Sequence, residues 1–282
     1  MIEDVEMKTS SASDAKRVGV IVPILSDNDI AYEIIDDSSI CRFLVEHDMP
    51  GAEYISLNIP YDPDVSEGYF TYYERMSNEN TLSAAAYEIS KKKCNSIAYA
   101  CTSGSFFRGL EYAQHQVDVL SKSAAVPATN TSMAFLAALD VLGAKKVDVV
   151  LPYAPEIGRW FASFLSEVGV SVGTLWHMKP TESGSFFEMD CEAELAEFVA
   201  SRPSSNDPIL IPCTELSSLR RMELFERVSG RPVLAANQVT VWHALTLAGV
   251  TPNISDSGSF FRSYAQAADE TSTLPLRSTV RD

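Results

Sequence analysis

Apolar and polar positions divide most of the chain into short apolar runs that alternate with longer segments of helical periodicity. The apolar runs have the length and the β-branched residues of buried strands. They occupy residues 18–22, 53–59, 97–100, 147–151, 170–176 and 209–211. Helical spacing covers residues 30–44, 80–93, 156–168 and 191–200, and it also begins at 106, after 130 and after 237. Strands that alternate with helices predict an α/β fold with parallel sheets.

Two stretches of the chain share one arrangement of residues. In residues 96–109 (SIAYACTSGSFFRG) an apolar run leads to Cys101, a hydroxyl-rich turn and a helical segment. In residues 208–219 (PILIPCTELSSL) a short apolar run leads in the same way to Cys213. A strand ending in proline precedes each stretch, and an asparagine before an amphipathic helix (Asn130, Asn237) follows each. The chain therefore contains two degenerate copies of one α/β half, and approximate two-fold symmetry would place the two cysteines on opposite walls of one cleft.

The position of each cysteine suggests chemistry. Open α/β folds bind ligands at the carboxyl edge of the sheet, and a helix N-terminus at that edge favours an anion. A cysteine in such a turn can have a lowered thiol pKa, so an active pair should include one that is alkylated rapidly near neutral pH. The alternative for each cysteine taken alone is a buried structural side chain beside a loop.

These residues resemble a known superfamily, the cofactor-independent aspartate/glutamate racemases with their relatives maleate cis-trans isomerase and arylmalonate decarboxylase. Residues 213–215 (CTE) are similar to the racemases' second-cysteine motif, with Pro212 where a glycine is usual. Residues 101–109 (CTSGSFFRG) are similar to the first-half loop of the isomerase and decarboxylase branch. The resemblance covers residues 18–250. It implies two pseudo-symmetric parallel-sheet α/β halves with the active site in the cleft between them.

The resemblance also implies roles for single residues. Cys101 and Cys213 would be catalytic. The expected substrate-binding residues are Pro23, Ser26, Thr102, Ser103, Tyr153 and Thr214. In the isomerase and decarboxylase branch, a tyrosine placed like Tyr153 donates a hydrogen bond to a substrate carboxylate. Ser26 has the spacing from Pro23 at which that branch carries an asparagine.

We expect three parts in the chain. Residues 1–17 are polar and acidic and would form a disordered arm. Residues 18–125 together with 236–282 would form the first half, and residues 126–235 the second. Family precedent implies that the helix after Asn130 enters the second half and that the helix after Asn237 returns to the first.

Two cysteines on opposite faces of a planar intermediate would allow proton transfer without a cofactor. One thiolate removes the hydrogen α to a carboxylate, and the other group returns a proton on the far side. Alternatively, one thiolate adds to a C=C bond, the adduct rotates and the thiolate leaves, as in maleate isomerase. An arylmalonate-type decarboxylase would use Cys213 as its proton donor; that branch carries a glycine where Cys101 stands. A non-catalytic ligand-binding protein on the same fold is a further alternative.

The composition of the chain argues against several classes of partner and cofactor. The formal net charge of −16 argues against nucleic acid and against an anionic membrane. A carboxylate substrate must therefore be held by local N–H groups and dipoles. The five cysteines form no CxxC motif and there is no histidine cluster, so we expect neither a metal nor another cofactor. We expect a cytoplasmic protein with reduced thiols, and a homo-oligomer is compatible with the sequence.

One segment has two interpretations. Residues 60–77 are rich in tyrosine (Tyr61, Tyr69, Tyr72 and Tyr73) and lack a clear period. They would form either a surface loop leading into a helix or a lid that gives the substrate an aromatic wall. The sequence leaves open the substrate, the reaction among the three above, and which cysteine acts as the base.

Overall fold

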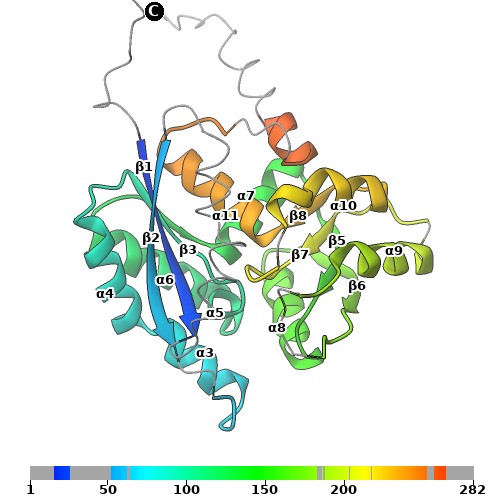
Figure 1. Cartoon of the computed structure of the whole chain (residues 1–282), viewed down its shortest axis with the longest axis horizontal. Coiled ribbons are helices and arrows are strands. Elements are labelled where there is room, and N and C mark those ends of the chain that lie inside the picture. Colours follow the sequence, from blue (N-terminus) through cyan, green and yellow to red (C-terminus); the bar gives the residue numbers. More distant parts are fainter. Residues whose placement is uncertain are drawn as a thin grey trace, which may run out of the picture.

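The computed structural model describes residues 16–25, 52–61, 64–182, 186, 188–202, 204–216, 218–252 and 257–264. Two four-stranded parallel sheets lie side by side (Figure 1). The first sheet contains β1 (Lys16–Leu25), β2 (Ala52–Tyr61), β3 (Ser96–Tyr99) and β4 (Ala128–Asn130), in the order β2-β1-β3-β4. The second contains β5 (Lys146–Leu151), β6 (Ser171–His177), β7 (Ile209–Ile211) and β8 (Val233–Ala235), in the order β6-β5-β7-β8. The equal strand order confirms the predicted fold of two similar α/β halves.

The strand register aligns the predicted site residues at one edge of each sheet. In the first sheet Ile21 pairs with Tyr99, so Pro23 and Cys101 follow at the same carboxyl edge. In the second sheet Val149 pairs with Leu210, so Tyr153 and Thr214 follow at the corresponding edge. The buried residues Ile97–Tyr99 and Ile209–Ile211 explain why short apolar runs form the central strands.

Nine α-helices and one 3-10 helix have defined bounds in the described part of the chain, and residues 259–264 are also helical. In the first half they are α3 (Tyr69–Ser77), α4 (Glu79–Ser90), α5 (Ser103–Phe106) and α6 (Gly109–Ala124). The later helices are α7 (Thr131–Leu142), α8 (Pro155–Ser166), α9 (Cys191–Ser201), η1 (Leu219–Arg221), α10 (Met222–Ser229) and α11 (Ala236–Leu247). Asn130 accepts a hydrogen bond from the Met133 N–H and so caps α7, and Gly143 ends that helix with φ of 61°.

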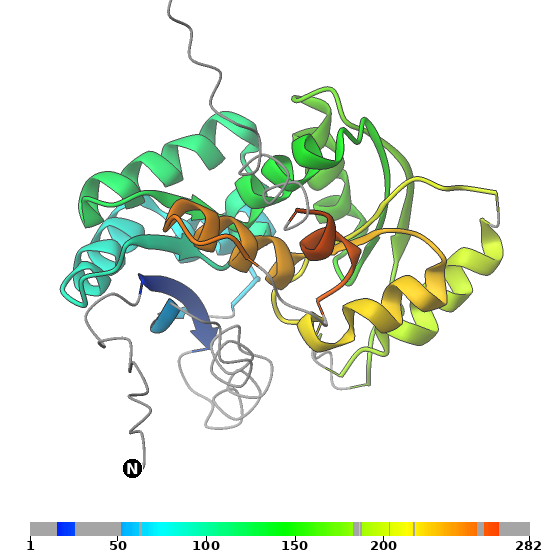
Figure 2. The same ribbon diagram turned by 90° about the horizontal axis from the view of Figure 1, so that it is seen from above.

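Helices α7 and α11 connect the halves and pack against each other. Thr240 of α11 donates a hydrogen bond to Thr131 of α7 over 2.9 Å, and both side chains are buried. Helix α11 follows β8 of the second sheet but packs against β3 and β4 of the first. Seen from above, it crosses between the halves (Figure 2). Since β4 pairs with β3, the first sheet extends beyond residue 125, where the sequence analysis placed its boundary.

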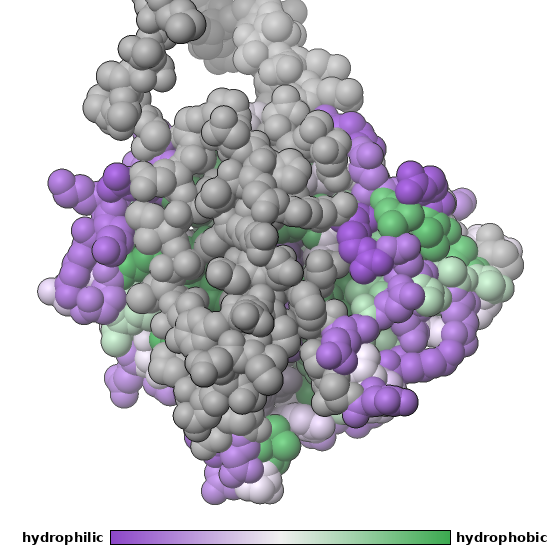
Figure 3. Space-filling model, in the orientation of Figure 1, coloured by the Kyte–Doolittle hydropathy of each residue, from purple (hydrophilic) through white to green (hydrophobic). Residues whose placement is uncertain are grey.

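The core is continuous through both halves and is built from Val, Ile, Leu, Phe and Ala side chains. Hydrophilic residues prevail along both edges of the face in Figure 3. No helix in the described part of the chain has both the length and the hydropathy that a membrane span requires. The predicted helix at 30–44 and residues 1–15 of the predicted arm lie outside the described residues, whereas Lys16 and Arg17 already belong to β1.

Candidate active site

Cys101 lies directly after β3, where the chain turns into the short helix α5. Its side chain is buried, and the Ser103 hydroxyl, the Tyr99 hydroxyl and the Gly104 N–H are placed to stabilise a thiolate there. The Tyr99 hydroxyl is fully buried and has no hydrogen bond of ordinary geometry within the described residues. A Cβ on Gly104 would lie 3.0 Å from the Cys101 sulfur and 3.0 Å from that hydroxyl. Glycine therefore lets the turn close around this sulfur without pressing on it, whereas a larger residue would require the sulfur or the hydroxyl to shift.

Cys213 occupies the equivalent position after β7. It is buried, and the backbone N–H groups of Glu215 and Leu216 and the Tyr153 hydroxyl are placed to stabilise its thiolate. The Asn237 side-chain amide donates to the Thr214 carbonyl over 3.1 Å and to the Leu216 carbonyl over 3.3 Å. These two bonds fix the loop that carries the sulfur. They also explain why an asparagine follows the cysteine loop in the second half.

Two buried tyrosines each lie near the cysteines of both halves. Tyr153, directly after β5, is close enough to both Cys101 and Cys213 to interact electrostatically with each. Tyr73 of α3 interacts in the same way with both thiols, and its hydroxyl lies beside the Ser103 hydroxyl. Both tyrosines are buried. The two thiols therefore share one pair of phenol groups, as expected if the cysteine loops face a common site.

Tyr73 was not among the residues predicted for the site. Sequence analysis assigned its segment either to a surface loop leading into a helix or to a lid. In the structure residues 69–77 form a helix. The centroid of its Phe70 ring lies 5.1 Å from that of Phe107 and 6.3 Å from that of Trp160 in α8. Helix α3 thus bridges the two halves and directs Tyr73 inward. The density of tyrosines was the available signal, but it did not indicate which of them faces the cysteines.

The remaining predicted residues lie around this centre. The Thr102 side chain is buried and its hydroxyl has no hydrogen-bond partner among the described residues. Ser103 opens α5 beside Cys101. Thr214 is partly exposed next to Cys213, and Pro23 is at the same sheet edge as Cys101. Ser26 lies outside the described residues. His177, at the end of β6, uses Nδ1 to contact the Tyr153 carbonyl at 2.9 Å and so supports the backbone of that tyrosine.

The thiol pKa values contradict the expectation of an activated cysteine. Burial raises the pKa of Cys101 to about 11, and the carboxylate of Glu215 acts in the same direction. Burial raises the pKa of Cys213 further still, again with a contribution from Glu215. The sequence argument relied on a helix N-terminus, but α5 spans only residues 103–106 and its weak dipole cannot offset the loss of hydration. Both groups are therefore thiols near neutral pH.

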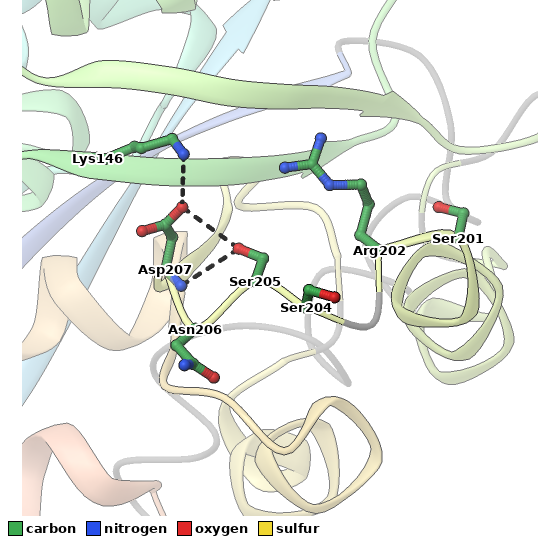
Figure 4. A pocket seen from close by; sticks show the side chains of 7 residues that line it. All are labelled: Lys146, Ser201, Arg202, Ser204, Ser205, Asn206 and Asp207. Carbon is green, nitrogen blue, oxygen red and sulfur yellow. Dashed lines mark hydrogen bonds and ion pairs between the residues drawn. The ribbon is translucent and has the colours of Figure 1, made fainter.

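A polar hollow at the opposite edge of the second sheet is not part of this site. Its volume is about 580 Å³, and it is lined by Lys146, Ser201, Arg202, Ser204, Ser205, Asn206 and Asp207 (Figure 4). Lys146 pairs with Asp207 at 3.2 Å. Because Lys146 begins β5 and Tyr153 follows its end, the length of the strand separates this hollow from the cysteines. No group of three metal-ligating side chains occurs among the residues that the structure describes.

The comparisons with known proteins agree with this geometry. The family model described as arylmalonate decarboxylase matches residues 69–261, a range that includes both cysteine loops, Tyr73 and Tyr153. The chain belongs to the arylmalonate decarboxylase family. The predicted branch of the superfamily is thereby confirmed.

Relatives within and beside the arylmalonate decarboxylase family are distant in sequence. Arylmalonate decarboxylase from Bordetella bronchiseptica is 23% identical over 71% of this chain and 82% of its own length. Maleate isomerase from Geobacillus stearothermophilus is 24% identical over 62% of this chain and 72% of its own length. The structure of maleate cis-trans isomerase from Nocardia farcinica superimposes with a TM-score of 0.74 at 18% identity, covering 90% of this chain and 99% of that one. This similarity of structure confirms the fold.

Proposed function

We propose that this member of the arylmalonate decarboxylase family is a cofactor-independent isomerase of a small carboxylic or dicarboxylic acid. Cys101 and Cys213 would be its reacting groups. The observation that carries the proposal is that two cysteines, at equivalent positions of the two halves, interact with the same two tyrosines. A reaction that needs one group on each face of a planar intermediate requires such a pair.

The donors around each sulfur suggest how a thiolate would be held during the reaction. Both thiols are protonated in the resting site, so the one that acts as base or nucleophile must lose its proton as substrate binds. Ser103, Tyr99 and the Gly104 N–H would then stabilise a Cys101 thiolate. Tyr153 and two backbone N–H groups would stabilise one at Cys213. Donors fixed by the fold need no reorganisation when the charge develops.

Hydroxyl groups would bind the substrate carboxylate. Tyr73 and Tyr153 are buried phenols beside both thiols, and the Thr102 hydroxyl is buried without a partner among the described residues. We assign these three groups, with Ser103 and Thr214, to the carboxylate and to the charge that develops on it. Pro23 and Ser26 would line the same site from the end of β1. A buried hydroxyl left without a partner is costly, which supports a bound acceptor at Thr102.

Two routes remain for the isomerase. In racemisation or epimerisation one thiolate takes the α-hydrogen and the other thiol supplies a proton to the opposite face. In cis-trans isomerisation a thiolate adds to the double bond and later leaves. A cysteine-to-serine variant of the Nocardia farcinica maleate cis-trans isomerase is described with a covalently bound succinylcysteine intermediate, which supports the second route in a relative of the same fold.

Decarboxylation is the second candidate, favoured by the family model and by the Bordetella bronchiseptica relative. It requires one proton donor after CO₂ has left, and Cys213 would be that donor. The presence of Cys101 argues against this route, since a second thiol would have no role in it. The formal net charge of −16 favours a small-molecule substrate over nucleic acid, and an odd number of cysteines without paired spacing favours a cytoplasmic location, where thiols stay reduced.

Incubation in D₂O with a panel of amino acids, hydroxy acids and dicarboxylates tests the proposal. α-Deuterium incorporation that requires both cysteines would support racemisation, and interconversion of cis and trans isomers would support addition to a double bond. Release of CO₂ from a malonate, retained in Cys101→Gly, would favour the decarboxylase instead. Absence of all three reactions across the panel would contradict the proposed function.

A further inference from the structure

Gln116 is a buried polar side chain of α6 to which the mechanism above gives no role. Its Nε2 group donates one hydrogen bond to the Gly104 carbonyl over 2.8 Å and another to the Ser77 carbonyl over 3.3 Å. Its Oε1 accepts a bond from the Asn130 side-chain amide over 3.1 Å. Because a carbonyl can only accept, these partners fix which end of the Gln116 amide faces them. Both N–H groups of the amide are therefore in use, each on a different helix.

The two carbonyls connect Gln116 to Cys101 on one side and to Tyr73 on the other. Gly104 belongs to the turn around Cys101, and a Cβ on it would lie 3.0 Å from the sulfur. Ser77 ends α3, and its hydroxyl donates to the Tyr73 carbonyl over 2.6 Å. A single side chain of α6 thus joins the loop that carries Cys101 to the helix that carries Tyr73.

The second half holds its cysteine loop in a different way. Asn237 donates directly to two carbonyls of the loop that carries Cys213. Asn130 precedes α7 as Asn237 opens α11, but its amide donates to the Ala113 carbonyl over 2.9 Å and to Gln116. Asn130 therefore acts on the first cysteine loop through Gln116. This relay allows the same amide to reach α3.

We propose that Gln116 is a positioning residue for the reaction at Cys101, because it fixes the Tyr73 phenol relative to the Cys101 loop. This inference deepens the proposed function and rests on it. If Tyr73 binds the substrate carboxylate while Cys101 reacts, the spacing between them decides whether one substrate reaches both. An ion pair of 3.0 Å between Arg108 and Glu74 also joins α3 to the end of this loop. Both of its side chains are well exposed, so water weakens the pair and the buried amide provides the firmer connection.

Two substitutions of Gln116 separate its hydrogen bonds from its packing. Gln116→Met keeps the length of the side chain and removes the amide. Gln116→Glu, protonated in a buried position, keeps one donor and can bond only one of the two carbonyls. Gln238→Met is the matched control, since Gln238 is an equally buried glutamine whose amide donates to the Ser257 carbonyl over 2.6 Å rather than to α3.

Fluorine NMR of the full chain with 3-fluorotyrosine in place of tyrosine reports the Tyr73 environment without turnover. The Tyr73 signal is the one that is missing from Tyr73→Phe. It should shift by more than its line width in Gln116→Met and by less in Gln116→Glu, and it should stay in place in Gln238→Met. If Gln116→Met does not fold, the Gln116→Glu spectrum alone decides. An unmoved Tyr73 signal in the folded Gln116 variants would overturn the proposal.

Turnover of a substrate identified from the panel gives the second test. Gln116→Met should lower kcat/KM by about 10- to 100-fold, as expected for a small displacement of a reacting group. In a Tyr73→Phe background the same substitution should cost much less, because the hydroxyl that it positions is already gone. Gln238→Met should show no such coupling. Equal losses from Gln116→Met in both backgrounds would refute the positioning role and leave the proposed function intact. A shifted Tyr73 signal without any turnover across the panel would refute the isomerase instead.

Discussion

Raising the pH should titrate Cys101 well above the range of an activated cysteine. Its pKa is raised from 9.0 to about 11 by burial, with Glu215 adding to the shift. At neutral pH the thiolate would then be about 10⁻⁴ of the population, compared with about 10⁻² for a thiol of pKa 9. Alkylation by iodoacetamide in the ligand-free protein should be correspondingly slow and should keep rising with pH to about 10 or beyond.

The assay is the ultraviolet absorbance of the thiolate followed against pH, as the difference between wild type and Cys101→Ser. Absorbance does not depend on reagent access to a buried sulfur, so it reports ionisation alone. A matched difference with Cys191→Ser provides a control, because burial also raises the pKa of that structural cysteine to about 11. A Cys101 transition centred below pH 9 would refute the argument that burial outweighs the donors around this sulfur.

The same shift predicts how stability depends on pH. A raised folded-state pKa means that the native protein keeps the Cys101 proton between pH 9.0 and about 11 while the unfolded chain releases it. The contribution is therefore complete below pH 9.0 and is lost as the pH rises through about 11, about 2–3 kcal/mol in total. Urea unfolding across this range should show a shallower decline in Cys101→Ala than in wild type. Identical slopes would contradict the assignment.

Two further predictions concern residues of the site, and a third concerns the stability of the second half. Tyr73→Phe and Tyr153→Phe should each reduce turnover by about 10²-fold if the phenols stabilise the transition state, and unchanged rates would make them packing residues. Gly104→Ala should displace the Cys101 sulfur, which lies 3.0 Å from the new Cβ, and so impair reactions at Cys101 more than at Cys213 in site-resolved labelling. Arg231→Met should lower the free energy of unfolding by about 3–5 kcal/mol in urea titrations, because Asp148, buried and bonded to Arg231 at 2.6 Å, would lose its main partner; a change under about 1 kcal/mol would contradict this.

The internal repetition of the sequence was sufficient to predict the fold. Two apolar runs, each followed by a cysteine and a polar turn, correspond to β3 and β7, which occupy the same place in the two sheets. Both cysteine loops and Tyr153 are at the expected edges because parallel register carries strand ends to one side. These features depend on the local pattern of residues and on the order of strands and helices along the chain. Both can be inferred from the sequence.

Features that depend on packing could not be predicted in this way. Tyr73 reaches the site because α3 lies across both halves, with Phe70 against Trp160, and such contacts between distant segments leave no periodic signal. The direction of the thiol pKa shifts was also wrong, since it follows from how completely each sulfur is buried. Glu215 was visible in the CTE motif. Its action on both thiols became apparent only when the halves were placed together.

The central claim is that one substrate is served by both thiols, and deuterium exchange in cysteine variants tests it most directly. With a substrate identified from the panel, Cys101→Ser and Cys213→Ser should each abolish full turnover in D₂O. For a substrate with an α-hydrogen, each variant should at most retain exchange from one face, because the surviving thiol serves that face alone. No stable adduct should accumulate for such a substrate. Full activity in Cys101→Ser, with loss only in Cys213→Ser, would contradict the two-cysteine mechanism and indicate a decarboxylase.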